Sequence, residues 1–65
     1  MCESRAVLVK GSSETTVLED VVYLEPIDGG VRLRNIEGKT LELKNVRIKG
    51  IDFLKHMIYL EEVHH

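Results

Sequence analysis

The stretch from residue 28 to residue 44 decides the fold, and it reads Asp28-Gly29-Gly30-Val31-Arg32-Leu33-Arg34-Asn35-Ile36-Glu37-Gly38-Lys39-Thr40-Leu41-Glu42-Leu43-Lys44. Apolar and charged residues alternate in two runs, and each run follows a turn signal that contains glycine. An alternation with period two predicts a strand with one buried and one exposed face. Glycine accepts the positive φ that a tight hairpin turn requires. The stretch therefore predicts two strands of an antiparallel sheet, each entered through a tight turn.

The period of two continues on both sides of this stretch. Residues 6–9, 15–18, 21–24 and 57–60 are rich in residues that favour strands, and a turn cluster occupies residues 11–14. No segment has the periodicity of an amphipathic helix. The sequence predicts an all-β fold, a small antiparallel barrel of five or six short strands that is SH3-like or Sm-like in architecture.

Such a barrel requires bent strands, and the sequence indicates where they bend. The apolar positions are odd-numbered at Leu43, even-numbered at Val46 and odd-numbered again at Ile51. The inward positions of a strand keep their parity unless a residue is inserted. We therefore expect bulged strands near Asn45 and Gly50, because bent strands let a small sheet curl into a barrel.

The chain of 65 residues is long enough for one domain, which we assign to residues 1–63. His64 and His65 form a tail that resembles the remnant of a purification tag. A domain this short buries only about 60% of its unfolded surface, and its one cysteine excludes an internal disulfide. We expect a metal or dimerisation to stabilise it. A single cysteine, the lack of a signal peptide pattern and the lack of an apolar run near 18 residues predict a cytoplasmic protein without a membrane segment.

The only cysteine, Cys2, follows the initiator Met1. Its thiolate lies next to backbone nitrogens, whether Met1 is removed and leaves Cys2 with a free amine or Met1 stays and contributes its own amine. Thiolate and nitrogen donors in a square-planar arrangement favour nickel(II) or copper(II) over calcium or magnesium. One terminus supplies two or three donors, whereas two termini related by a two-fold axis supply four. A metal site at Cys2 and Met1 is one interpretation, and an incidental thiol near a terminus is the other.

The sequence contains no constellation of residues that supports catalysis. It has no glycine-rich phosphate loop, no Cys-x-x-Cys motif and no His-Glu-x-x-His motif. His56 is the one histidine inside the predicted fold, and its position beside Lys55 favours a turn residue over a ligand. Without a pair of nucleophile and base, we predict that the protein is not an enzyme.

Positive charge is concentrated in the second half of the chain. Seven of the nine Lys and Arg residues lie in residues 31–55, against three acidic residues. This segregation predicts a basic stripe on one face, although a set of solvated strand faces gives the same pattern. The alternative function is therefore RNA binding by an Sm-like or SH3-like module, carried by Arg32, Arg34, Arg47 and Lys49. A third interpretation is an interaction module whose apolar strand at residues 57–60 builds a dimer or docks on a partner.

Five segments form a pattern that spans most of the chain. They are Met1-Cys2-Glu3-Ser4, Ala6-Val7-Leu8-Val9-Lys10, Val17-Leu18-Glu19-Asp20-Val21, Leu33-Arg34-Asn35-Ile36-x-Gly38 and His56-Met57-Ile58-Tyr59-Leu60-Glu61. Together they resemble the CooT family of small nickel-binding proteins, which is named for an accessory protein in the maturation of nickel-containing carbon monoxide dehydrogenase. The Met-Cys start is the most specific element of the resemblance.

The resemblance implies a homodimer of small β-barrels that binds nickel(II) through Cys2 of both chains. The backbone nitrogen of Cys2 or the amine of Met1 would complete the chelate. It also implies that the protein holds or delivers nickel for a client enzyme or another maturation factor, rather than catalysing a reaction. Members of the family also carry the label of predicted RNA-binding proteins, so the client need not be carbon monoxide dehydrogenase.

Overall fold

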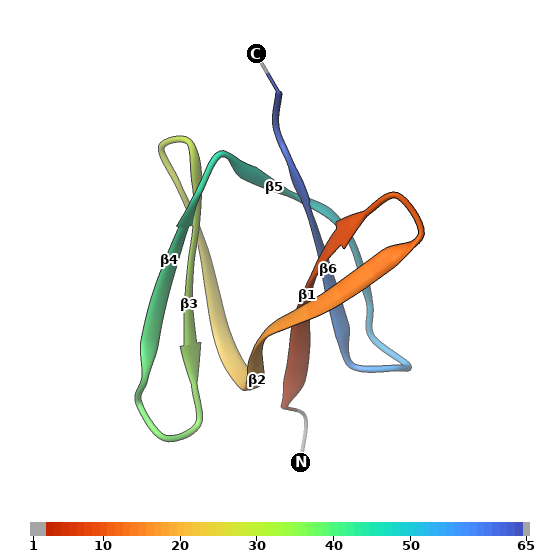
Figure 1. Cartoon of the computed structure of the whole chain (residues 1–65). Helices are drawn as coiled ribbons and strands as arrows, with labels where there is room; N and C mark the ends of the chain where they lie inside the picture. Colours follow the sequence, from red (N-terminus) through yellow and green to blue (C-terminus); the bar gives the residue numbers. More distant parts are fainter. Residues whose placement is uncertain (1–2, 65) are drawn as a thin grey trace.

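The computed structural model describes residues 3–64, and in this part of the chain it contains six strands and no helix. The strands are β1 (Ser4–Lys10), β2 (Ser13–Ile27), β3 (Gly30–Asn35), β4 (Thr40–Lys44), β5 (Val46–Asp52) and β6 (Met57–Glu62). They form one curled sheet (Figure 1). The prediction of a small all-β barrel-like fold is confirmed. Without a helix, the described chain holds no candidate for a membrane-spanning helix.

The strand order in the sheet is β4-β3-β2-β1-β6-β5. Four of the neighbouring pairs are antiparallel, but β1 and β6 are parallel, from Arg5 opposite Met57 to Val9 opposite Glu61. The prediction of an antiparallel barrel is therefore wrong for this one pair. Its two strands lie at opposite ends of the sequence, and an alternation with period two is the same for either strand direction. The sequence pattern consequently contains no signal of a parallel pair.

Strand β2 is long because it belongs to both halves of the sheet. Its first half pairs with β1 and its second half pairs with β3. Between the two halves, Asp20 has a φ of 57°, which is a left-handed conformation. The carbonyl oxygen of Asp20 accepts a hydrogen bond from the backbone N–H of Ile36 at 2.9 Å. Asp20 therefore marks a bend within a continuous strand.

The two bends predicted near Asn45 and Gly50 differ from each other in structure. The register between β5 and β6 shifts between Ile48 and Gly50, so the bulge expected near Gly50 is confirmed. Asn45 instead separates β4 from β5, with a φ of 61°, and its N–H donates to the carbonyl oxygen of Gly29 at 2.5 Å. In the described residues no ladder joins β4 to β5, so these two strands are the edges of a curled and partly open sheet.

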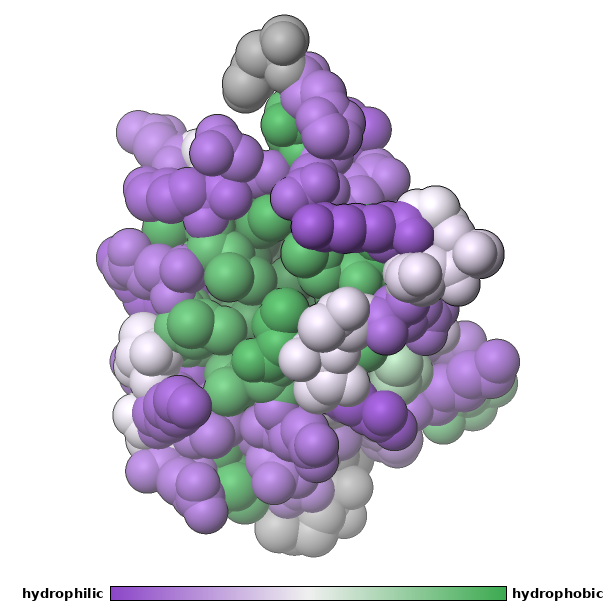
Figure 2. Space-filling view, in the orientation of Figure 1, coloured by the Kyte–Doolittle hydropathy of each residue, from purple (hydrophilic) through white to green (hydrophobic). Residues whose placement is uncertain are grey.

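The core lies on the concave side of the curled sheet. Its buried side chains come from five of the six strands and are Ala6, Leu18, Val21, Val31, Leu33, Val46, Ile58 and Leu60. Leucines of β4 are only partly buried and pack against them. Figure 2 shows apolar side chains gathered in the middle of the visible face, with polar side chains around them. Partly buried apolar side chains packed against the core thus reach the surface of the molecule.

Candidate metal centre and its surroundings

The two predicted metal ligands, Met1 and Cys2, lie outside the described residues, which begin at Glu3. Strand β1 begins at Ser4, two residues after Cys2. Figure 1 shows this start of β1 at the same end of the molecule as the turn between β5 and β6. The parallel pairing of β1 with β6 is the cause, because both strands enter the sheet at that end. Ser4, at the start of β1, therefore lies at the same end of the molecule as the β5–β6 turn.

The β5–β6 turn is held in a defined shape by hydrogen bonds. The carboxylate oxygen Oδ1 of Asp52 accepts hydrogen bonds from the backbone N–H groups of Leu54 and Lys55, each at 3.0 Å. This is the pattern by which aspartate stabilises a turn. The turn ends at His56, whose φ is 56° and whose carbonyl oxygen accepts a hydrogen bond from the N–H of Arg5 at 2.9 Å. The prediction that His56 is a turn residue is confirmed.

Large apolar side chains are exposed at the start of β1. They surround a shallow hollow of about 160 Å³, which Ser4 lines together with Val22, Tyr23, Ile51 and Phe53. Phe53 is 80% exposed, and the next residue, Leu54, is 95% exposed. We call Val22, Tyr23, Ile51 and Phe53 the N-terminal apolar patch. A contiguous apolar surface of this kind is typical of a site of protein–protein contact.

The sequence pattern does not indicate this patch. Its residues come from β2, from β5 and from the turn after β5, so only the tertiary structure brings them together. One signal was available in the sequence. Phe53 and Leu54 follow Asp52 directly, and two large apolar residues next to a turn-forming aspartate are unusual in a solvated turn.

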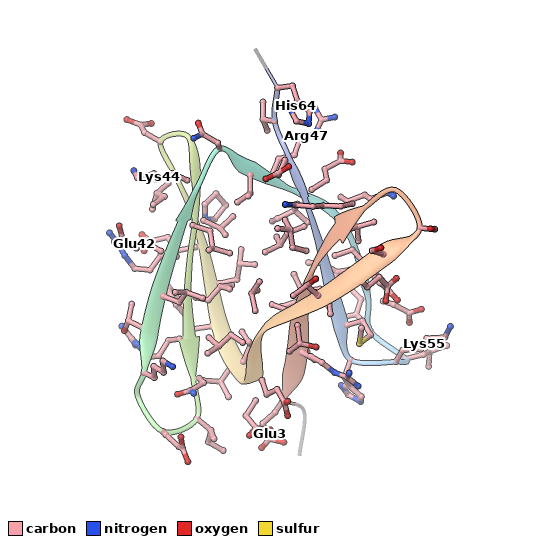
Figure 3. All side chains as sticks on the ribbon, in the orientation of Figure 1. Glu3, Glu42, Lys44, Arg47, Lys55 and His64 are labelled. Carbon is pink, nitrogen blue, oxygen red and sulfur yellow. The ribbon has the colours of Figure 1, made fainter. Side chains whose placement is uncertain are left out.

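Residues 3–64 contain no group of three or more His, Cys, Asp or Glu side chains that could hold a metal ion. Figure 3 shows Glu3 at the lower end of the molecule and Lys55 at the lower right, in the β5–β6 turn. A thiolate with adjacent backbone nitrogens is the donor set that Met1 and Cys2 offer, and it suits a square-planar ion such as nickel(II).

The four cations predicted for RNA binding have different surroundings. The guanidinium nitrogens of Arg32 lie 2.7 Å from a carboxylate oxygen of Glu25 and 2.6 Å from one of Glu42. Hydrogen bonds to these carboxylates raise the pKa of the guanidinium, and the bond to Glu42 has the larger effect. Arg47 contacts Glu61 at 2.8 Å. Both of these arginines therefore have a carboxylate partner within the chain, which lowers their attraction for phosphate.

The other two cations of this set are Arg34 and Lys49. The guanidinium of Arg34 lies 5.4 Å from the ring centroid of Tyr23, within the range of a cation–π interaction. Lys49 lines a separate hollow on β5 together with Tyr59. In the sheet, β3 and β5 are separated by β2, β1 and β6. The hydrogen-bonded sheet does not place the four cations on neighbouring strands.

Comparisons with known proteins agree with the fold and with the resemblance found in the sequence. The family model "CO dehydrogenase accessory protein CooT" matches residues 1–61. The crystal structure of a "putative CooT" from Carboxydothermus hydrogenoformans superposes with a TM-score of 0.89 at 35% identity, and the match covers 97% of this chain and 100% of that one. A search of curated proteins gives no significant match. Because the family match includes Cys2 and extends through most of β6, the chain belongs to the CooT family of CO dehydrogenase accessory proteins.

Proposed function

We propose that the protein is a cytoplasmic nickel(II)-binding accessory protein that supplies nickel to CO dehydrogenase or to another nickel enzyme. The observation that carries the proposal is the family match, which begins at residue 1 and so includes the only cysteine. The matched family is one of accessory proteins of CO dehydrogenase, and the proposed role needs no catalytic residue. A single free thiol suits a reducing compartment, where it remains available to a metal.

The ligands in this proposal are the thiolate of Cys2 and a terminal nitrogen, from either the Cys2 backbone or the Met1 amine. A square-planar ion needs four donors, and one terminus supplies too few. Two chains related by a two-fold axis supply two thiolates and two nitrogens, because each residue near the axis meets its own copy. The proposed centre is therefore shared between the two chains of a homodimer.

The N-terminal apolar patch supports this dimer. Its residues surround Ser4, which follows Cys2 by only two positions, so a second chain that covered the patch would bring its own terminus close. Burial of apolar surface stabilises association by about 25 cal/mol per Å² before the entropic costs of binding. A domain of this size also gains most from such support. The patch thus explains both why two chains would associate and where the nickel would lie between them.

The test is a titration of the full-length protein with nickel(II), followed by near-ultraviolet absorption and by native mass spectrometry. We expect a thiolate-to-nickel absorption band and one nickel ion for two chains. Cys2→Ala removes the thiolate and keeps a small second residue, so the band disappears while the fold remains. Ser4→Ala is the matched control and keeps the band.

The histidine tail needs its own control because histidines bind nickel on their own. The double variant His64→Asn/His65→Asn should keep both the band and the stoichiometry. Nickel binding by the Cys2→Ala variant equal to that of the parent protein would contradict the proposal.

A further inference from the structure

Two arginines of the sheet differ in the number of carboxylates that they contact. Arg32 on β3 lies opposite Glu25 of one neighbouring strand and opposite Glu42 of the other. Its guanidinium contacts both carboxylates, and its side chain is 37% exposed. Arg47 on β5 lies opposite Glu61, the one carboxylate that it contacts in the described part of the chain, and its side chain is 68% exposed. Because β5 is an edge strand, the other side of Arg47 is open to a further carboxylate.

The first half of β5 has one apolar and one basic face. Val46 is buried and Ile48 is half-buried, whereas Arg47 and Lys49 are exposed on the opposite face. Val46 and Ile48 also line a hollow of about 320 Å³ together with Val63. In the described residues β5 forms a ladder with β6 only, so its other edge has no strand partner. An unpaired edge of this kind accepts an extended segment of another chain by strand addition.

The charges on β5 do not suit pairing with the same strand of a second copy. In an antiparallel pair with Ile48 opposite its own copy, Arg47 lies opposite Lys49 twice. A shift of the two-fold axis by one residue places Arg47 or Lys49 opposite its own copy instead. Like charges directly opposite each other destabilise a sheet. The edge therefore favours a segment with acidic residues at these positions.

This edge is separate from the N-terminal apolar patch. Ile51 and Phe53 of the patch follow the bulge at Gly50, whereas Arg47 precedes it. Figure 3 shows Arg47 at the end of the molecule opposite to Glu3. A segment paired with the first half of β5 consequently leaves the patch free for a second chain.

We propose that the first half of β5, Val46–Lys49, binds an extended acidic segment of a partner protein by strand addition. A glutamate or aspartate of this segment lies opposite Arg47 and repeats the arrangement of two carboxylates around Arg32. The adjacent residues of the segment are apolar and lie beside Val46 and Ile48, next to the hollow. The inference goes beyond the proposed function, because it assigns a contact site for a client chain and requires no metal.

The test titrates the full-length protein with a fluorescent peptide of alternating valine and glutamate, about as long as a typical strand. Fluorescence anisotropy measures the affinity, and amide chemical shifts in NMR spectra locate the contact. We expect shifts along Val46–Lys49 and at Val63. A peptide with lysine in place of glutamate should bind at least about tenfold more weakly, because it places like charges together.

Backbone methylation of the peptide tests strand addition directly. One peptide is methylated at the valine nitrogens and another at the glutamate nitrogens, and both keep their charges. Alternate residues of a strand direct their N–H groups to opposite edges, so only one of the two sets of N–H groups faces β5. We expect one methylated peptide to lose binding and the other to keep it. Equal affinity of both for the protein would overturn the inference.

The variant Arg47→Gln tests the charge pair, and Arg34→Gln is its matched control. The control makes the same substitution on β3, which has a neighbour on both sides. Arg47→Gln should weaken the glutamate peptide at least about threefold, within the range of a cross-strand charge pair, and Arg34→Gln should not. The pair of Arg47 with Glu61 is exposed, so its loss should leave the fold intact, as circular dichroism can verify.

Several results would overturn the inference. They are no binding of the glutamate peptide, equal binding of the lysine peptide, equal loss in the two variants, and shifts along β4 or the N-terminal apolar patch instead of β5. Self-association that Arg47→Gln abolishes would assign the edge to β4 of a second copy, where Glu42 lies between two leucines. None of these results changes the nickel titration of the parent protein and of Cys2→Ala, so this inference and the proposed function fail separately.

Discussion

The β3–β4 hairpin and the N-terminal end of the sheet differ in whether their side chains are buried or paired within the chain. In the hairpin, Leu33 is fully buried, and Arg32 contacts carboxylates on both neighbouring strands. The Oδ1 atom of Asn35 accepts hydrogen bonds from two backbone N–H groups of the following turn, at 3.1 and 2.8 Å. At the N-terminal end, Phe53 is 80% exposed instead.

This difference indicates which region stabilises the fold and which is available for contact. Side chains that are buried or paired within one chain contribute to folding, whereas an exposed apolar side chain gains its contacts only from a partner. The hairpin and the N-terminal end should therefore respond in opposite ways to mutation. Variants in the hairpin should change the free energy of unfolding, and variants in the patch should change association.

The largest expected effect is that of Leu33→Ala in the hairpin. Leu33 has no exposed surface and pairs with Leu24 on one side and Leu41 on the other. Truncation of a buried leucine lowers the free energy of unfolding by about 2–5 kcal/mol, which is a large part of the stability of a domain of this size. Urea unfolding followed by circular dichroism measures the loss. A decrease below about 1 kcal/mol would show that the core is centred elsewhere.

The hairpin is also the region that sequence reasoning predicted best. The alternation of Leu33 and Leu43 with charged residues is a local pattern, and the hairpins that it predicts need only short loops. The bulge at Gly50 was predictable for a similar reason, because a shift in parity is visible along one strand. Asn45 shows the limit of that argument, since a shift in parity does not distinguish a bulge from a break between strands.

The N-terminal end could not be predicted in the same way because long-range pairing forms it. Cys2 was noticed from its type and position, but the sequence does not show that His56 lies beside the start of β1. The neighbourhood of Tyr23 and Phe53 likewise depends on how β2 and the β5–β6 turn meet in space. Residue types therefore indicated the possible ligands, and only the tertiary structure shows what surrounds them.

The second prediction, of intermediate size, concerns Phe53→Ser in the N-terminal apolar patch. Because Phe53 is mostly exposed in the single chain, we expect the free energy of unfolding of the monomer to change by less than about 0.5 kcal/mol. Self-association should weaken by at least about tenfold, since aromatic residues often dominate the binding energy of an interface. Sedimentation equilibrium across a range of protein concentrations measures this change.

The matched control for Phe53→Ser is Ile27→Ser. Ile27 is a half-buried apolar residue that ends β2, and it lines a hollow with Val46 and Val63 instead of the N-terminal hollow. We expect this variant to keep the self-association of the parent protein. Equal loss of association in both variants, or none in Phe53→Ser, would remove the patch from the dimer interface and leave the position of the second chain open.

The smallest expected effect concerns the charged side chains of the β3–β4 hairpin. It tests whether the ion pairs of this hairpin limit binding of RNA. Arg32 is exposed but is held between Glu25 and Glu42, so the parent protein should retard RNA only weakly, and only at low salt. Glu25→Gln/Glu42→Gln frees this guanidinium beside Arg34 and should increase retardation slightly, with a steeper dependence on salt. Glu14→Gln/Glu19→Gln makes the same change in net charge away from Arg32 and should have less effect. Tight RNA binding by the parent protein at physiological salt, lost on neutralising Arg34 and Lys49, would instead favour the RNA-binding alternative, because phosphate contacts would then outweigh the internal ion pairs.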